Sequence, residues 1–134
     1  MKLNQIVTYA TKGSAGFDIV ADETVVIKQR HTAKIKTTLR IVSAEQGEYV
    51  SILPRSSLSS KGILAVDGTI DGDYEGLWSV VILNTTGDIY KIHAGDRIAQ
   101  GILRSFNYIE GAHVADRIRG QGAFGSTDQV KQEK

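Results

Sequence analysis

The segment from residue 68 to residue 76 carries the side chains best suited to chemistry. It reads Gly-Thr-Ile-Asp-Gly-Asp-Tyr-Glu-Gly, which places three carboxylates and one aromatic ring between glycines and between two apolar stretches. On an extended backbone Asp71, Asp73 and Glu75 share one face, and a tight turn can lift one acid away from the others. The pattern therefore indicates a reactive site on a hairpin, with a solvated acidic hairpin tip as the alternative.

Four further clusters have side chains of a kind that bind anions or bases: Ala15–Ile19, Pro54–Leu58, Gly95–Gln100 and Arg119–Thr127. The first is a glycine and an acid entering a strand. The second sets an arginine and hydroxyls beside an expected helix N-terminus, where backbone N–H groups favour anions. The third begins as a turn and ends with an amide, and the fourth joins a guanidinium, hydroxyls, glycines and one aromatic ring. Together the five clusters indicate a nucleotide site, although each alone also fits a surface turn, a helix cap or a glycine-rich tail.

Composition narrows the class of protein. The 134 residues fit one domain, and 41% hydrophobic with 23% charged residues suffices for a core. Cysteine is absent, which excludes disulfides and thiolate zinc sites and suits a reducing compartment. A net charge of +1 argues against bulk attraction to nucleic acid or membranes. The sequence has no Gly-Lys-Ser or Gly-Lys-Thr phosphate loop, and its three histidines lack the spacing of metal ligands.

The first ten residues have no continuous apolar core, so we expect neither a signal peptide nor a membrane span. The expected location is the cytoplasm, or the host cytoplasm or nucleus for a viral protein.

The elements that must position these clusters are mostly short strands. Strict alternation over Ala33–Val42 predicts one half-buried antiparallel strand. Further strands are expected at Thr24–Lys28, Glu48–Leu53, Ile63–Val66, Leu77–Asn84, Ile89–Ile92 and Arg97–Leu103. One helix is expected over Ser56–Lys61, capped by serine and ended by Gly62. Strands at this spacing indicate a sandwich or barrel.

Two segments depart from this pattern. Leu77–Leu83 is apolar on both faces, so both faces need cover, and another subunit could supply one of them. The C-terminal stretch contains Gly120, Gly122 and Gly125 and then a polar end, so we expect it to be mobile when nothing is bound.

All five clusters, in this order and over nearly the whole chain, resemble the five motifs of the trimeric deoxyuridine triphosphatase (dUTPase) family. The resemblance implies an all-β, jelly-roll-like sandwich or barrel with one short helix and a flexible glycine-rich C-terminal tail. It implies a catalytic part at residues 1–118 and a mobile tail at residues 119–134 that closes over the site. The implied reaction is hydrolysis of dUTP to dUMP and pyrophosphate, which keeps uracil out of DNA and supplies dUMP for thymidylate synthesis. The implied assembly is a homotrimer whose active sites draw on all three chains.

The resemblance also assigns roles to single residues. Asp71 would be the general base that activates water for attack on the α-phosphorus, and Gln100 would position that water or bind phosphate oxygens. Asp18 would accept a hydrogen bond from a water bound to Mg2+, the implied cofactor. Tyr74 would press on the deoxyribose and exclude a 2′-hydroxyl. The substrate-binding residues would be Arg55, Ser56, Ser57, Gly68, Ile70, Tyr74, Arg119, Phe124, Gly125, Ser126 and Thr127.

The chain departs from the common family pattern at Ser57 and Ala123, where glycine is usual, and at Asp128. The nearest rival enzyme is dCTP deaminase, whose second motif also reads Arg-Ser-Ser-Leu. Deamination needs an acid in the strand after the hairpin, and residues 80–83 contain none. A regulatory protein that docks partners on the nucleotide surface and a plain β-sandwich binding module are further hypotheses.

Overall fold

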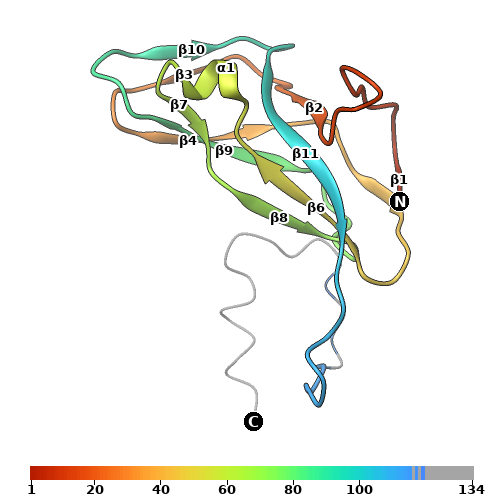
Figure 1. The fold of residues 1–134 in the computed structure, drawn as a ribbon. Helices are drawn as coiled ribbons and strands as arrows, with labels where there is room; N and C mark the ends of the chain where they lie inside the picture. Colours follow the sequence, from red (N-terminus) through yellow and green to blue (C-terminus); the bar gives the residue numbers. More distant parts are fainter. Residues whose placement is uncertain (116, 118, 120–134) are drawn as a thin grey trace.

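Short strands rich in isoleucine and valine form antiparallel sheets packed face to face (Figure 1). The computed structural model describes residues 1–115, 117 and 119. In chain order the elements are β1 (Lys2–Leu3), β2 (Phe17–Val20), β3 (Val25–Ile27), β4 (Thr32–Lys36), β5 (Ile41–Ser43), β6 (Glu48–Leu53), α1 (Ser56–Ser59), β7 (Ile63–Ala65), β8 (Gly68–Asp71), β9 (Ser79–Asn84), β10 (Tyr90–Ile92) and β11 (Arg97–Ser105). Over the described residues this confirms an all-β fold with one short helix.

Two sheets build the sandwich. The larger has the strand order β2-β11-β6-β8, and the smaller has the order β4-β9-β7. Two-stranded pairs, β1-β5 and β10-β3, extend the ends. The strand β11 is central in the larger sheet, whereas β8 is its edge. The strands that carry the candidate residues are therefore fixed by pairing on at least one side.

The core lies between the two sheets. Ile19 and Ile52 contribute from the larger sheet and Ile35 and Ile82 from the smaller one, each 3% exposed or less. Trp78 is fully buried among them. Because about 25 cal/mol is gained per Å² of apolar surface removed from water, this layer holds the sheets together.

The two faces of Leu77–Leu83, the segment that is apolar on both faces, are buried to different extents. In β9, Val80 and Ile82 are fully buried, whereas Val81 and Leu83 on the other face are only half-buried. Leu77, just before the strand, is 56% exposed. One face of this segment therefore keeps apolar surface that a single chain does not cover.

The prediction of one strand over Ala33–Val42 is wrong in its continuity. The chain pairs with β9 as β4, leaves the sheet after Lys36, and pairs with β1 as β5. The break is held by hydrogen bonds from the Thr37 hydroxyl to the Trp78 carbonyl at 2.8 Å and from the Trp78 N–H to the Leu39 carbonyl at 2.9 Å. The alternating sequence pattern still predicts which side chains are buried, since every second side chain through the break is buried.

The helix differs from its prediction in length and in its cap. It ends at Ser59, and its N-cap is Arg55 with no side-chain cap, so the expected serine cap is wrong. The Arg55 carbonyl instead accepts hydrogen bonds from the Leu58 and Ser59 N–H groups and from the Ser59 hydroxyl. Gly62 has a φ of +82°, as expected for a glycine that ends a turn. In the part of the chain that the structure describes, no helix is long and apolar enough to cross a membrane.

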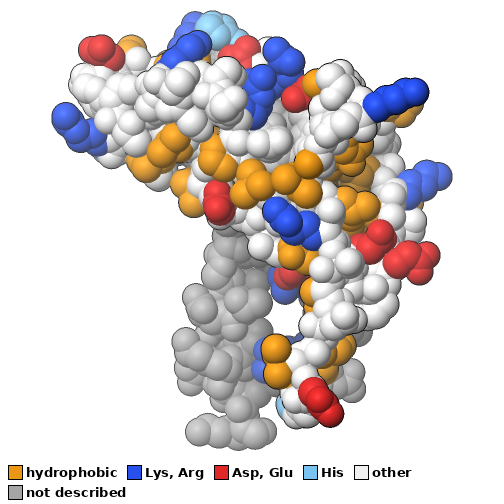
Figure 2. All heavy atoms as spheres, in the orientation of Figure 1, with side chains coloured by type: hydrophobic (Ala, Val, Ile, Leu, Met, Phe, Trp, Pro, Cys, Tyr) orange, Lys and Arg blue, Asp and Glu red, His pale blue; other side chains and the backbone are white. Residues whose placement is uncertain are grey.

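The surface carries both apolar and basic side chains. Figure 2 shows hydrophobic side chains gathered across the middle of the body, with lysine and arginine side chains scattered around them, several of these at the end that carries α1 and β10. After β11 the chain leaves the body (Figure 1), and this extension exposes Phe106, Tyr108 and Ile109. Apolar surface of this kind marks places where another molecule can dock.

Candidate active site

The acidic segment forms a tight turn at the end of an edge strand. β8 ends at Asp71, and the Tyr74 N–H donates to the Asp71 carbonyl at 3.0 Å, which closes a turn over Gly72 and Asp73. Because of this turn, the three acids do not lie along one face of an extended strand. The Asp71 side chain is 43% exposed and that of Asp73 is 70% exposed. The turn thus holds Asp71 as the more sheltered of these two acids.

This segment is not a simple hairpin, because its two arms belong to different sheets. β8 pairs with β6, whereas β9 pairs with β4 and β7. The β7-β9 ladder ends at Ala65 and Ile82, with one further hydrogen bond from the Val66 N–H to the Val81 carbonyl at 2.8 Å. Beyond that bond the chain continues into β8, which pairs with β6 and not with β9. The expected hairpin pairing across the acidic turn is therefore wrong.

The separated arms enclose a cavity of about 240 Å³. It is lined by Ile52, Val66–Asp71, Tyr74, Ser79–Val81 and Arg119. Because β8 is an edge strand, some of its backbone N–H and C=O groups face away from β6. Apolar walls with a few backbone donors and acceptors suit a flat heterocycle.

Tyr74 is fixed at this cavity by the chain that follows it. Its hydroxyl donates to the Leu77 carbonyl at 3.2 Å. The ring lies so close to Gly76 that a Cβ on that residue would overlap it. Tyr74 is half-buried and packs against the core. Gly76 therefore gives the aromatic ring its place at the cavity.

Arg119 joins the fifth cluster to the third. Its Nη2 lies 2.7 Å from Asp71 Oδ2 and its Nε lies 3.1 Å from Asp73 Oδ1. The guanidinium is 28% exposed, so solvent screens the ion pairs only in part. A cation at hydrogen-bond distance competes with water for the Asp71 carboxylate. Sequence spacing did not indicate this contact, although the opposite charges of the two clusters are compatible with it.

A second group of candidate residues lines a different cavity, of about 350 Å³. Its candidate residues are Asp18, Arg55, Ser56, Ser57 and Gln100, with Gly16 beside them. Gln100 lies opposite Asp18 in the β2-β11 ladder, so both side chains are on one face of the sheet. Hydroxyl, amide, guanidinium and carboxylate groups meet here at the start of α1.

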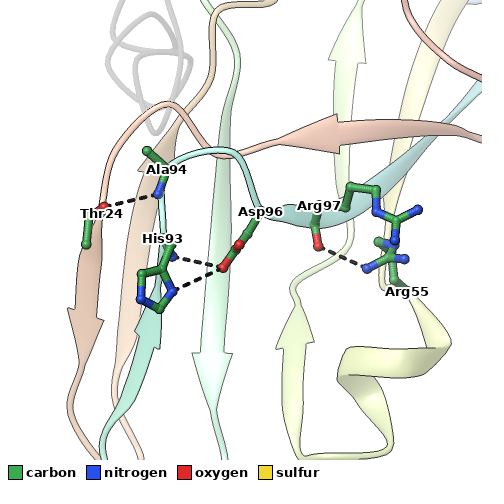
Figure 3. Close-up of polar contacts among 6 residues, drawn as sticks. All are labelled: Thr24, Arg55, His93, Ala94, Asp96 and Arg97. Carbon is green, nitrogen blue, oxygen red and sulfur yellow. Dashed lines mark hydrogen bonds and ion pairs between the residues drawn. The ribbon is translucent and has the colours of Figure 1, made fainter.

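Arg55 is held by the first residue of β11, directly after the turn that joins β10 to β11 (Figure 3). Its Nη1 donates to the Arg97 carbonyl at 3.0 Å. The turn is tied by the His93 N–H to the Asp96 carboxylate at 2.9 Å and by the Ala94 N–H to the Thr24 hydroxyl at 3.0 Å. The five clusters gave Arg97 no individual role. Its position directly after a glycine turn, in the same cluster as Gln100, was the available signal.

Among the described residues, the two groups of candidate residues line two different cavities. Asp71 and Tyr74 line the first cavity, and Arg55 and Gln100 line the second. Each described candidate residue belongs to one of these two sets. Phe124, Gly125, Ser126 and Thr127, like Ala123 and Asp128, lie outside the described residues. One chain therefore presents two separate parts of the predicted site.

Glu48, an acid near the turn, has a pKa below its ordinary value. The Met1 amino group lies 2.9 Å from Glu48 Oε1. This hydrogen-bonded ion pair, helped by the Glu45 N–H, lowers the pKa of Glu48 below its ordinary value. Glu48 also pairs with Ser105 at the end of β11, so this charge lies where the two strands meet the turn.

Comparisons with known proteins match this geometry to one family. The family model for dUTPase matches residues 3–128. The deoxyuridine 5'-triphosphate nucleotidohydrolase of Nautilia profundicola is 39% identical over an alignment of 135 residues. The alignment covers 94% of this chain and 94% of that protein. A mutant dUTPase of Staphylococcus bacteriophage 80alpha with dUpNHpp matches with a TM-score of 0.74 at 26% identity, covering 94% of this chain and 96% of that one.

A second solved structure is that of a mutant dUTPase from phage phi11 of S. aureus, which details the coordination of a structural Mg(II) ion. It matches with a TM-score of 0.74 at 26% identity, covering 87% of this chain and 97% of that one. These likenesses identify the sandwich as the jelly roll that the five clusters implied. With the family match extending over nearly its whole length, the chain belongs to the dUTPase family.

Proposed function

We propose that this chain hydrolyses dUTP to dUMP and pyrophosphate, with Asp71 as the general base. The observation that carries the proposal is the Asp71 carboxylate at the end of an edge strand, lining a cavity that suits a flat base. Asp71 takes a proton from water, and the water oxygen bonds to the α-phosphorus. The bond from that phosphorus to the bridging oxygen breaks, and pyrophosphate leaves. A carboxylate held by a turn is suited to this step, since a misplacement of about 1 Å can cost on the order of 100-fold in rate.

The first cavity binds the nucleoside. Backbone groups from Val66 to Ile70 face the uracil edge, since β8 is an edge strand with outward N–H and C=O groups. Tyr74 stacks on the deoxyribose and leaves no room for a 2′-hydroxyl. Phe124 of the tail covers the base. Selection of uracil and deoxyribose thus rests on shape and backbone polarity rather than on charge.

The second cavity binds the triphosphate. Arg55, Ser56 and Ser57 supply charged and hydroxyl donors to phosphate oxygens. The Gln100 amide positions the attacking water. The residues present also fit Mg2+, because Asp18 adds a carboxylate among hydroxyl and amide oxygens, and Mg2+ binds largely through substrate phosphates and water. When bound, the ion would neutralise phosphate charge, and Asp18 would accept a hydrogen bond from one of its waters.

Arg119 changes partner when substrate binds. In the structure Arg119 lies on Asp71 and Asp73, and the terminal phosphates of the substrate would offer it more negative charge. Its transfer to the phosphates frees the Asp71 carboxylate for water. Residues 119–134 form a tail on the 1–118 catalytic part, in which Gly125, Ser126 and Thr127 help to hold the phosphates. Closure of the tail would exclude bulk water from the reaction.

The working form is a homotrimer in which neighbouring chains complete each site. The reason is that one chain divides the candidate residues between two cavities, so a nucleotide touching both needs a second chain. Leu77, Leu103 and Phe106 are each more than 40% exposed and supply apolar surface for such contacts. The proposed location is the cytoplasm, or the host cytoplasm or nucleus for a viral protein, where free nucleotides are available as substrate.

The decisive experiment measures pyrophosphate release from dUTP, UTP, dTTP and dCTP. We expect turnover of dUTP alone, and a loss of about 100-fold or more in kcat for Asp71→Asn, because a general base contributes about 10²–10⁴-fold. Glu75→Gln is the matched control, since Glu75 is an exposed acid of the same segment. Ammonia release from dCTP would favour the deaminase, and full activity of Asp71→Asn would remove Asp71 from its role.

A further inference from the structure

The Gln100 side chain has a defined orientation in the second cavity. Its Nε2 donates to the Pro54 carbonyl at 3.0 Å. A carbonyl can only accept, so the amide must turn its NH₂ group toward Pro54 and its Oε1 away from it. The Oε1 atom therefore needs space on the side of β11 where β2 lies.

Gly16 provides that space. It precedes β2 by one residue, two positions before Asp18, which lies opposite Gln100 in the ladder. This places Gly16 diagonally across from Gln100 on the same face, within reach of a long side chain. A Cβ on Gly16 would lie 2.5 Å from Gln100 Oε1, and 3.2 Å from both Gln100 Cβ and the Gly101 carbonyl oxygen. The Gln100 amide thus occupies the volume that any other residue at position 16 would fill.

We infer that Gly16 is a positioning residue for Gln100 and that its missing side chain sets where the Gln100 amide lies. With Oε1 over Gly16 and Nε2 on Pro54, the amide keeps one N–H and its oxygen available to the cavity. A methyl group at position 16 would force Oε1 to move, and because Nε2 belongs to the same planar amide, its contact with Pro54 would change with it. The inference rests on the proposed function, in which Gln100 positions the attacking water.

The test compares Gly16→Ala with Gly13→Ala, a glycine in the same loop whose added Cβ would meet nothing within 4 Å. We expect Gly16→Ala to lower kcat for dUTP by about 10-fold or more with KM little changed, because a misplaced amide affects the water rather than substrate binding. Gly13→Ala should retain wild-type values. Equal kcat values in the two variants, with an active wild type, would overturn the inference and leave the proposed function standing. An inactive wild type would instead contradict the proposed function.

A double-mutant cycle separates positioning from a general effect on the fold. In a Gln100→Ala background the 2.5 Å contact is gone, so Gly16→Ala should change kcat by less than about threefold. Additive losses would contradict the inference, since they would place the effect in the backbone contact with Gly101. If Gly16→Ala alone does not fold, recovery of folding by Gln100→Ala supports the same coupling, and failure to recover opposes it.

A spectroscopic readout is independent of turnover. In ¹⁵N-labelled protein, the side-chain amide pair that disappears in Gln100→Ala identifies Gln100. That pair should shift in Gly16→Ala and keep its position in Gly13→Ala. An unchanged Gln100 signal in Gly16→Ala would show that the amide has not moved, and the inference would fail.

Discussion

Asn84 shows how one buried polar side chain can hold several segments together. It is fully buried at the end of β9. Its Nδ2 donates to the Ile27 carbonyl at 3.1 Å and to the Asp88 carbonyl at 2.8 Å, while its Oδ1 accepts from the Thr86 N–H and hydroxyl. Both ends of the amide are needed, because the carbonyls can only accept and the Thr86 N–H can only donate. Asn84 therefore ties β9 to the end of β3 and to the loop that follows β9.

We predict that Asn84→Asp destabilises the chain by about 2–4 kcal/mol, because a carboxylate cannot donate to the two carbonyls and is costly to bury. Denaturant unfolding would measure the change. Asn107→Asp is the control, since Asn107 is exposed, and it should change stability by less than about 0.5 kcal/mol. Equal stability of the two variants would show that the Asn84 amide is dispensable.

The strands position the turn that carries Asp71 through contacts with their neighbours. β8 pairs with β6, which sets Asp71 opposite Tyr49. The turn beyond Asp71 packs against the start of β6 so closely that a Cβ on Gly72 would lie 2.5 Å from the Glu48 carbonyl oxygen. Because that oxygen belongs to the backbone, it cannot move aside as the end of a side chain can. The location of Asp71 thus depends on the absence of a side chain at the next residue.

Gly72→Ala should therefore displace the turn. We expect a loss of about 1–3 kcal/mol in stability, as for other overpacked sites, together with a fall in kcat for dUTP. Thermal unfolding and pyrophosphate release would measure the two effects. Gly87→Ala is the matched control, because its added Cβ meets nothing within 4 Å. Wild-type turnover and stability in Gly72→Ala would contradict this account of how Asp71 is placed.

The folded chain keeps the nucleoside and triphosphate parts of the proposed site in separate cavities. Mixtures of two substituted chains can therefore distinguish sites within one chain from sites shared between chains. Chains carrying Asp71→Asn and chains carrying Arg55→Ala are each expected to be inactive. If one chain supplies Asp71 and another supplies Arg55, mixed trimers contain some sites free of both substitutions.

We predict that unfolding and refolding the two variants together at equal ratio restores about a quarter of wild-type activity, since each contributing chain is intact in half of the cases. Asp71→Asn mixed with Tyr74→Ala is the control, because both residues line one cavity of the same chain and should not complement. Pyrophosphate release would measure the recovery. Activity that stays at the level of the separate variants would argue against sites shared between chains.

Local patterns determined much of this protein from its sequence alone. Alternation predicted the buried side chains between Ala33 and Val42, and turn residues marked the ends of most strands, because both depend on neighbours along the chain. The types of residues in the five clusters were sufficient to indicate the family, which the comparisons confirmed.

Tertiary structure alone decided which of these residues meet. It moved the chain to a new partner after Lys36, separated the arms around the cavity, and placed Arg119 on Asp71. It also laid the Gln100 amide over Gly16. The physical reason is that these contacts join residues far apart along the chain, and which of them form depends on burying all strands at once rather than on any local spacing.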